Sequence, residues 1–239
     1  ANTGRNWDYR YCWIRDASLC LSAFCEMGHP GEDEAFMGWL LSSTRLTWPR
    51  LQIFYDIYGE TSQKERELDY LEGYCGSRPV RVGNAAANQL QSGIYGELIS
   101  AVHDYLDRGG SLGPDEAKLL LGFGRAAAEV WRKPDQGIWE TRSAARHHTH
   151  SKAMCWAAMD RLVRMHEAGH IRQPVDAFRR EREAIRDAIE RHGVSRDGSH
   201  YVAAWGEDGV DASLLLLAEY GYQAADHPRM HATFQRIER

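Results

Sequence analysis

Long and short connections alternate between the apolar helical segments of this 239-residue chain, and this alternation restricts the folds that it can adopt. Apolar residues at a spacing of three and four predict about eight helices. Every second helix follows a long connection rich in Trp, Tyr, Arg and Gly, and the other helices follow short connections. The residues that we expect to begin the alternate helices lie 60 to 68 positions apart: Asp16, Asn84, Ser151 and Asp211. This pattern predicts a two-helix unit that occurs four times.

Antiparallel helical hairpins of this kind place all their long connections on one face. The sequence therefore predicts an all-α array of hairpins, either a toroid or a solenoid, with one functional face. An irregular α-helical bundle is the alternative, because short connections alone allow it equally. Residues 51–83 lack helical periodicity, and we expect a short strand pair in 51–58 and a glycine-rich loop in 73–83.

The charge of the chain argues against one class of partner, and its cysteines indicate its redox environment. The net charge is −5 without a basic stripe, which argues against a nucleic-acid partner. No apolar run approaches the length needed to span a membrane, and residues 1–5 do not resemble a signal peptide. The five cysteines include no C-x-x-C pair, so we expect reduced thiols and a cytoplasmic protein. The sequence does not indicate an oligomeric state.

The stretch 133–142 carries the most suggestive chemistry. Pro134 ends an apolar helical segment, and a turn then presents Glu140 between Trp139 and Arg142. A carboxyl group beside an indole ring is partly removed from water, which favours its protonated form. Glu140 is therefore a candidate general acid. The alternative is an ordinary surface turn in which Trp139 is an anchor and Glu140 is solvated.

Two histidine-containing segments could indicate a metal site. His166, Glu167 and His170 match the H-E-x-x-H pattern of zinc peptidases, which needs both histidines on one face of a continuing helix. Gly169 and Pro174 predict that the helix ends there, so this alternative is disfavoured. The residues 147–150 include three histidines without a carboxylate or cysteine at ligand spacing, and we expect a polar loop there. We therefore expect neither a metal nor another cofactor.

Several segments in order along the chain resemble conserved blocks of glycoside hydrolase family 15, the group of glucoamylases, glucodextranases and bacterial trehalases. They are Asn-Trp-Asp-Tyr-Arg-Tyr-Cys-Trp-Ile-Arg-Asp at 6–16, the glycine-rich segment 73–96, Gly-Ile-Trp-Glu-Thr-Arg at 137–142, and the segments 151–161 and 211–216. The resemblance implies an (α/α)6 toroid and inverting hydrolysis of α-glucosidic bonds, with glucose released from the non-reducing end. No cofactor is implied.

The resemblance also implies roles for individual residues. Glu140 is the general acid. Arg15 and Asp16 bind hydroxyl groups of the terminal glucose, and Tyr9 and Trp13 line the same subsite. The remaining candidates for substrate binding are Trp139 and Arg142. The general base is expected in a block beyond Arg239.

Some features differ from the family pattern. Gly93 stands where bacterial members commonly have Asp, and His148 and His150 replace residues that are usually aromatic. About eight helices are expected, whereas a complete toroid has about twelve. We therefore expect residues 1–239 to be one partial catalytic domain without a second domain.

The substrate is predicted only as a class. We favour α-glucans or malto-oligosaccharides over trehalose, because the residues that would select the second sugar ring are not evident. A non-catalytic carbohydrate-binding protein of the same fold is the further alternative.

Overall fold

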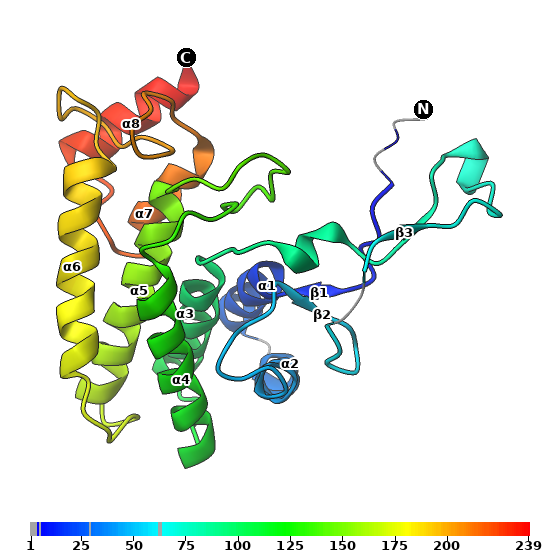
Figure 1. The fold of residues 1–239 in the computed structure, drawn as a ribbon. Helices are drawn as coiled ribbons and strands as arrows, with labels where there is room; N and C mark the ends of the chain where they lie inside the picture. The colour runs from blue at the N-terminus through cyan, green and yellow to red at the C-terminus, as the bar shows by residue number, and fades with distance from the viewer. Residues whose placement is uncertain (1–3, 5, 29, 62–63) are drawn as a thin grey trace.

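The computed structural model describes residues 4, 6–28, 30–61 and 64–239, and these residues form eight α-helices with a few short strands. The helices are α1 (Ile14–Met27), α2 (Pro30–Arg45), α3 (Ile94–Asp107), α4 (Pro114–Val130), α5 (Thr149–Glu167), α6 (Asp176–His192), α7 (Leu216–Glu219) and α8 (Pro228–Glu238). Figure 1 shows α3, α4, α5 and α6 standing side by side. The all-α fold class predicted from the sequence is confirmed.

The helices form two rows, as expected for stacked hairpins. In the inner row, α1 packs against α3 and α3 packs against α5, while α2, α4 and α6 pack on the outside of these helices. Burial follows this arrangement, because α5 is buried along almost its whole length whereas α6 buries only Phe178, Ile185 and Ile189. The hairpin arrangement predicted from alternating connections is therefore correct.

The contact between α3 and α5 is especially close. A Cβ atom on Gly96 would lie 2.0 Å from the carbonyl oxygen of Met154, so the backbones of the two helices meet at this glycine. One turn earlier, a Cβ atom on Gly93 would only reach ordinary contact, 3.6 Å from Met154. Gly96 thus allows the two inner helices to approach each other.

The inner helices begin on the same face of the molecule, as predicted. Arg15 at the start of α1, Ile94 at the start of α3 and Ser151 at the start of α5 line one small cavity together. Asn84 lines a neighbouring cavity with Glu140. The N-terminal ends of alternate helices therefore converge on the long connections.

The first predicted helix start is wrong in detail. Asp16 lies inside the first turn of α1, whose N-cap is Trp13. The reason is a strand pair: β1 (Cys12–Trp13) is antiparallel to β2 (Phe54–Tyr55), and the Ile14 N–H donates to the Ile53 carbonyl at 2.9 Å. The strand predicted within 51–58 thus exists, but its partner comes from the N-terminal segment.

Two further predicted caps act on 3-10 turns. The side chain of Asn84 accepts a hydrogen bond from Ala86 N–H in η2 (Ala85–Asn88), and α3 begins only at Ile94. Asp211 likewise caps η3 (Ala212–Leu215), which leads into α7. These side chains bond only to the first turn, so they do not determine whether an α-helix follows.

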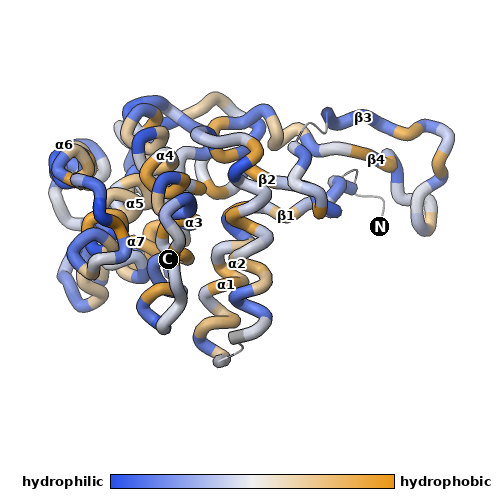
Figure 2. Tube along the Cα trace, turned by 90° about the horizontal axis from the view of Figure 1, so that it is seen from below, coloured by the Kyte–Doolittle hydropathy of each residue, from blue (hydrophilic) through white to orange (hydrophobic). Residues whose placement is uncertain are grey.

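Two segments lie away from the inner row. The last helix, α8, begins after His227, whose side chain accepts a hydrogen bond from the Arg229 N–H. The glycine-rich region forms a projecting arm with the strand pair β3 (Arg66–Glu67) and β4 (Arg81–Val82) and the 3-10 turn η1 (Tyr74–Gly76). Figures 1 and 2 show this arm extending from the helical body.

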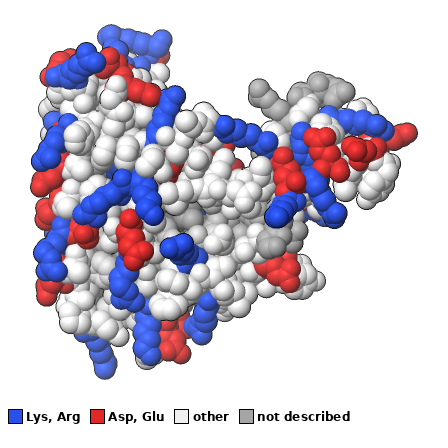
Figure 3. Space-filling model, viewed as in Figure 1, with Lys and Arg blue, Asp and Glu red and all other residues white. Residues whose placement is uncertain are grey.

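The distribution of surface charge and the state of the cysteines are as the sequence predicts. On the face shown in Figure 3, acidic and basic side chains are intermixed. None of the five cysteines, all within the described ranges, forms a disulfide. No helix in the described part of the chain is long and apolar enough to cross a membrane.

Candidate active site

The connection between α4 and α5 (residues 131–148, the acid loop) is anchored at its base and carries Glu140 near its tip. Asp135 and Arg146 exchange two backbone hydrogen bonds of 2.8 Å that close the loop. The buried carboxylate of Asp135 accepts bonds from the N–H and the hydroxyl of Ser92 at 2.9 and 2.8 Å. Glu140 itself has a left-handed backbone (φ 52°). The loop therefore presents Glu140 from a fixed base.

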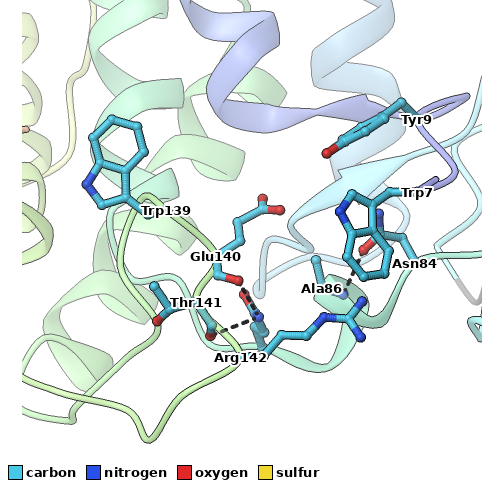
Figure 4. Close-up of a pocket in the computed structure, with 9 residues that line it drawn as sticks. Trp7, Tyr9, Asn84, Ala86, Trp139, Glu140, Thr141 and Arg142 are labelled. Atoms are coloured by element: carbon cyan, nitrogen blue, oxygen red, sulfur yellow. Dashed lines mark hydrogen bonds between the residues drawn. The ribbon is translucent and has the colours of Figure 1, made fainter. Parts of the chain in front are cut away.

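The carboxylate of Glu140 is held by two residues from the start of the chain. Trp13 Nε1 donates a hydrogen bond of 2.6 Å to Oε1, and Arg15 Nη1 lies 3.4 Å from the same oxygen. Trp13 is buried and packs against Phe54, with ring centroids 4.8 Å apart. In Figure 4 the side chain of Glu140 lies between Trp139 and Tyr9.

The indole that contacts Glu140 is not the one expected from the sequence. Trp139 is 59% exposed and its ring points away from Glu140 (Figure 4). Trp13 makes the contact instead, although it lies 127 positions away in the sequence. Residues 137–140 form a turn in which neighbouring side chains point in different directions, so adjacency to Trp139 did not imply contact.

Arg15 and Asp16 form a pair beside Glu140. Arg15 Nη2 donates to Asp16 Oδ2 at 3.0 Å, and Nη1 donates to the carbonyl of Ile138 at 2.8 Å. The side chain of Arg15 is only 19% exposed, whereas that of Asp16 is 60% exposed. Arg15 is therefore fixed between α1 and the acid loop, and Asp16 is open to a ligand.

Arg142 has a different carboxylate partner from Glu140. It pairs with Glu65 at 3.0 Å and stacks on the ring of Trp7, with the guanidinium carbon 4.1 Å from the ring centroid. Arg81 lies over the same ring at 4.5 Å. Arg142 thus pairs with Glu65 and ties the acid loop to the projecting arm.

Glu140 lies on the boundary between two adjacent cavities. The larger, of about 850 Å³, contains Trp13, Arg15 and Asp16. The smaller, of about 600 Å³, contains Trp7, Gln89 and Arg142. The two cavities share only Tyr9, Trp139 and Glu140 among the described residues that line them. All six candidate substrate-binding residues thus line one or both cavities.

One known protein family matches the chain along its length. The model of "Glycosyl hydrolases family 15" matches residues 1–239. The chain belongs to this family. The resemblance inferred from the sequence motifs is therefore confirmed.

Relatives within family 15 carry a consistent name. The chain is 35% identical to a trehalase of Mycolicibacterium smegmatis, over 98% of this chain and 35% of the relative. It is 32% identical to a trehalase of Thermoplasma volcanium, over 98% and 37%. Trehalase 1 of Sulfolobus acidocaldarius is 34% identical, over 98% and 40%. The chain therefore spans well under half of the length of these relatives.

Solved structures support the family 15 fold. A wild-type glycosidase superposes with a TM-score of 0.74 at 16% identity, over 95% of this chain and 60% of that structure. A glycosidase variant in complex with glucose gives a TM-score of 0.73, also at 16% identity. At this identity the likeness establishes the fold, and it agrees with the (α/α)6-type arrangement that the family resemblance implied.

The zinc-peptidase alternative does not fit this family 15 chain. Helix α5 ends at Glu167, so His170 lies beyond the helix and after Gly169. His166 Nδ1 lies 2.9 Å from the carbonyl of Ile171, and Glu167 pairs with Arg179 at 2.8 Å. The two histidines therefore do not share one helical face, as their spacing with Gly169 predicted.

The histidines at the end of the acid loop and the start of α5 have packing roles in the structure. His147 stacks on Trp205, with ring centroids 5.0 Å apart, and His148 forms a backbone bridge with Ala204. His150 is completely buried, and burial lowers its pKa to about 4. No group of three metal-ligating side chains occurs within the ranges that the structure describes.

Sequence reasoning did not find three residues at the site. Trp7 and Glu65 support Arg142, and Gln89 Nε2 donates to the carbonyl of Glu140 at 3.2 Å. Trp7 lies within the first family motif and could have been chosen for its aromatic ring. Glu65 has no motif around it, and only the fold brings it to the site.

Proposed function

We propose that this chain forms the general-acid part of the active site in a family 15 enzyme that hydrolyses the α-glucosidic bond of trehalose. The observation that carries the proposal is the position of Glu140 at the boundary of two cavities. A general acid must reach the oxygen that joins two sugar rings, and a carboxyl group between two ring-sized spaces meets this condition. The names of the relatives support the choice of trehalose.

The two cavities would take the two halves of the substrate. The glucose that is attacked would lie with Arg15 and Asp16, whose charged groups suit sugar hydroxyls. The leaving sugar would lie with Trp7, Gln89 and Arg142, where aromatic and polar groups are combined. Fixing both rings would hold the glycosidic oxygen beside Glu140.

The hydrogen bonds at Glu140 favour one oxygen as the proton donor. Oε1 accepts the bond from Trp13, so the acidic proton belongs on Oε2. Glu140 would give this proton to the glycosidic oxygen as the bond to the anomeric carbon breaks. Inversion also requires a carboxylate base, about 6.5–9.5 Å from the acid, to activate water. The family resemblance implies that the base follows Arg239, and no metal is needed in this scheme.

Trehalose replaces the α-glucans favoured from the sequence motifs. The motifs identify residues around the first glucose only, and they do not distinguish the second ring. The relatives cover the whole chain and are named trehalases, which is the more specific information. That the protein is cytoplasmic, and that residues 1–239 are one partial catalytic domain, remain predictions.

A substrate panel tests the proposal. The protein should be expressed from its complete reading frame and glucose release measured from trehalose, maltose and isomaltose, with Glu140→Gln as the control for contaminating activity. We expect trehalose to give the highest kcat/KM. Preference for maltose would restore the α-glucan assignment. Binding of these sugars without turnover would favour the non-catalytic alternative.

A further inference from the structure

Glu97, in the first turn of α3, is a buried acid that the proposed mechanism does not use. Only 4% of the residue is exposed, and its Oε2 atom has no hydrogen-bond partner in the described structure. An ionised carboxylate in such a position loses its hydration without compensation. Burial accordingly raises the pKa of Glu97 to about 8.

Glu97 shares a small cavity with Arg15, one of the two residues that contact the carboxylate of Glu140. It lines a small cavity together with Arg15, with Ile138 of the acid loop, and with His150 at the start of α5. The cavity leaves about 10 Å³ for the centre of a water molecule, which is close to the minimum for one water. Both ring nitrogens of His150 lack a partner among the described residues. The cavity is therefore polar and could join these groups through one water.

The charged and titratable groups around Glu97 come from three elements. Helix α1 contributes Arg15, which lowers the pKa of Glu97, and Asp16, which raises it by a smaller amount. His150 of α5 stays neutral because burial lowers its pKa to about 4. Tyr220, after α7, stays neutral because burial raises the pKa of its hydroxyl. Arg15 is thus the cation whose placement depends on the charge of Glu97.

We propose that Glu97 is a positioning residue for Arg15 and that it acts as a neutral carboxylic acid. Arg15 bonds to the carbonyl of Ile138 and to Asp16, and it lies 3.4 Å from Glu140. When Glu97 is neutral, it does not attract the guanidinium of Arg15, which then interacts with these groups and with the sugar. An ionised Glu97 would attract Arg15 into the interior, away from the substrate. This inference rests on the proposed function for its effect on sugar binding, but not for the charge state of Glu97.

The first test measures charge without any substrate. Infrared difference spectra of the protein from its complete reading frame, recorded at pH 7, should show a protonated-carboxyl band that is absent from Glu97→Gln. Glu167→Gln, which alters an exposed glutamate on α5, is the matched control and should keep the band. Absence of the band from the unsubstituted protein would overturn the proposal, whatever the enzyme hydrolyses.

The second test measures positioning. For the unsubstituted enzyme, KM for trehalose should rise about fivefold between pH 8 and pH 9 as Glu97 loses its proton, with a smaller change in kcat. Glu97→Gln should keep its neutral-pH KM over the same range, because the amide cannot ionise. A flat KM in the unsubstituted enzyme, the same rise in the Gln variant, or loss of activity in that variant at every pH would each contradict the proposal. If Glu97→Gln does not fold, the profile of the unsubstituted enzyme still decides.

Discussion

The α3–α5 helix pair and the acid loop lie next to each other but are held by different forces. The helix pair is buried along its length and meets backbone to backbone at Gly96. The acid loop is held by hydrogen bonds at Asp135 and by contacts of Glu140 with Trp13 and Arg15. The buried contacts are thus concentrated in the helix pair, whereas the loop carries the proposed general acid. Each substitution below should therefore affect one property much more than the other.

Substitution of Glu140 should give the largest difference between the effect on turnover and the effect on stability. In the enzyme from the complete reading frame, Glu140→Gln should reduce turnover of trehalose by about 10²–10⁴-fold, the usual loss for a general acid. The amide is nearly the same size, so sugar binding and the unfolding midpoint should change little. Glucosyl fluoride, whose leaving group needs no proton, should be hydrolysed much faster than trehalose by this variant. Equal loss on both substrates would show that Glu140 is not the acid.

The opposite effect is expected at Gly96. A methyl group there would clash with the Met154 carbonyl, so Gly96→Ala should lower the free energy of unfolding by about 3 kcal/mol, at the upper end of overpacking effects. Chemical denaturation measures this loss. Gly93→Ala is the matched control, because its Cβ atom would be 3.6 Å from Met154, and it should be tolerated. Equal effects of the two substitutions would contradict the close helix approach.

Trp13 tests the link between the two regions, because it packs in the core and also bonds to Glu140. Trp13→Phe keeps an aromatic ring but removes the donor. A hydrogen bond to a charged group contributes about 1.5–3 kcal/mol, so kcat for trehalose should fall about 10-fold or more. The control is Trp131→Phe, which removes an indole bond between the end of α4 and Glu181 of α6 and should not change kcat. An unchanged kcat in Trp13→Phe would mean that the bond does not orient the acid.

The smallest effect is expected where the arm meets the loop. Glu65→Gln weakens an ion pair to Arg142, whose side chain is 54% exposed, and pairs of this kind contribute about 0–1 kcal/mol. Stability should therefore change little. If Arg142 lines the space for the leaving sugar, KM for trehalose should rise a few-fold while kcat is nearly constant. A change in kcat alone would indicate that the arm affects Glu140 rather than sugar binding.

The parts predicted well from sequence are those that depend on local patterns. Apolar periodicity and the alternating connections predicted the helical hairpins and their common face, and the turn at 133–142 located Glu140. Gly169 correctly predicted that α5 ends before His170. These features depend on residues close together in the chain, so the sequence contains the information directly.

The parts that were missed depend on contacts across the fold. Trp13 reaches Glu140 over 127 positions, and Glu65 reaches Arg142 from the arm. Asn84 has the right chemistry for a cap but acts on a 3-10 turn. Glu97 resembles any polar residue on a helix until α1 and α5 cover it. A single sequence does not specify which side chains meet after such packing.

The left-handed backbone at Glu140 has a consequence for protein engineering. Residues other than glycine and, to a lesser degree, asparagine occupy this conformation at a cost of about 1 kcal/mol. Glycine at position 140 would relieve that cost, but it would also leave the buried Trp13 Nε1–H without its acceptor. These two effects on stability oppose each other. The strain of the backbone at position 140 is therefore offset by the bond that holds the carboxyl group, which we propose as the proton donor.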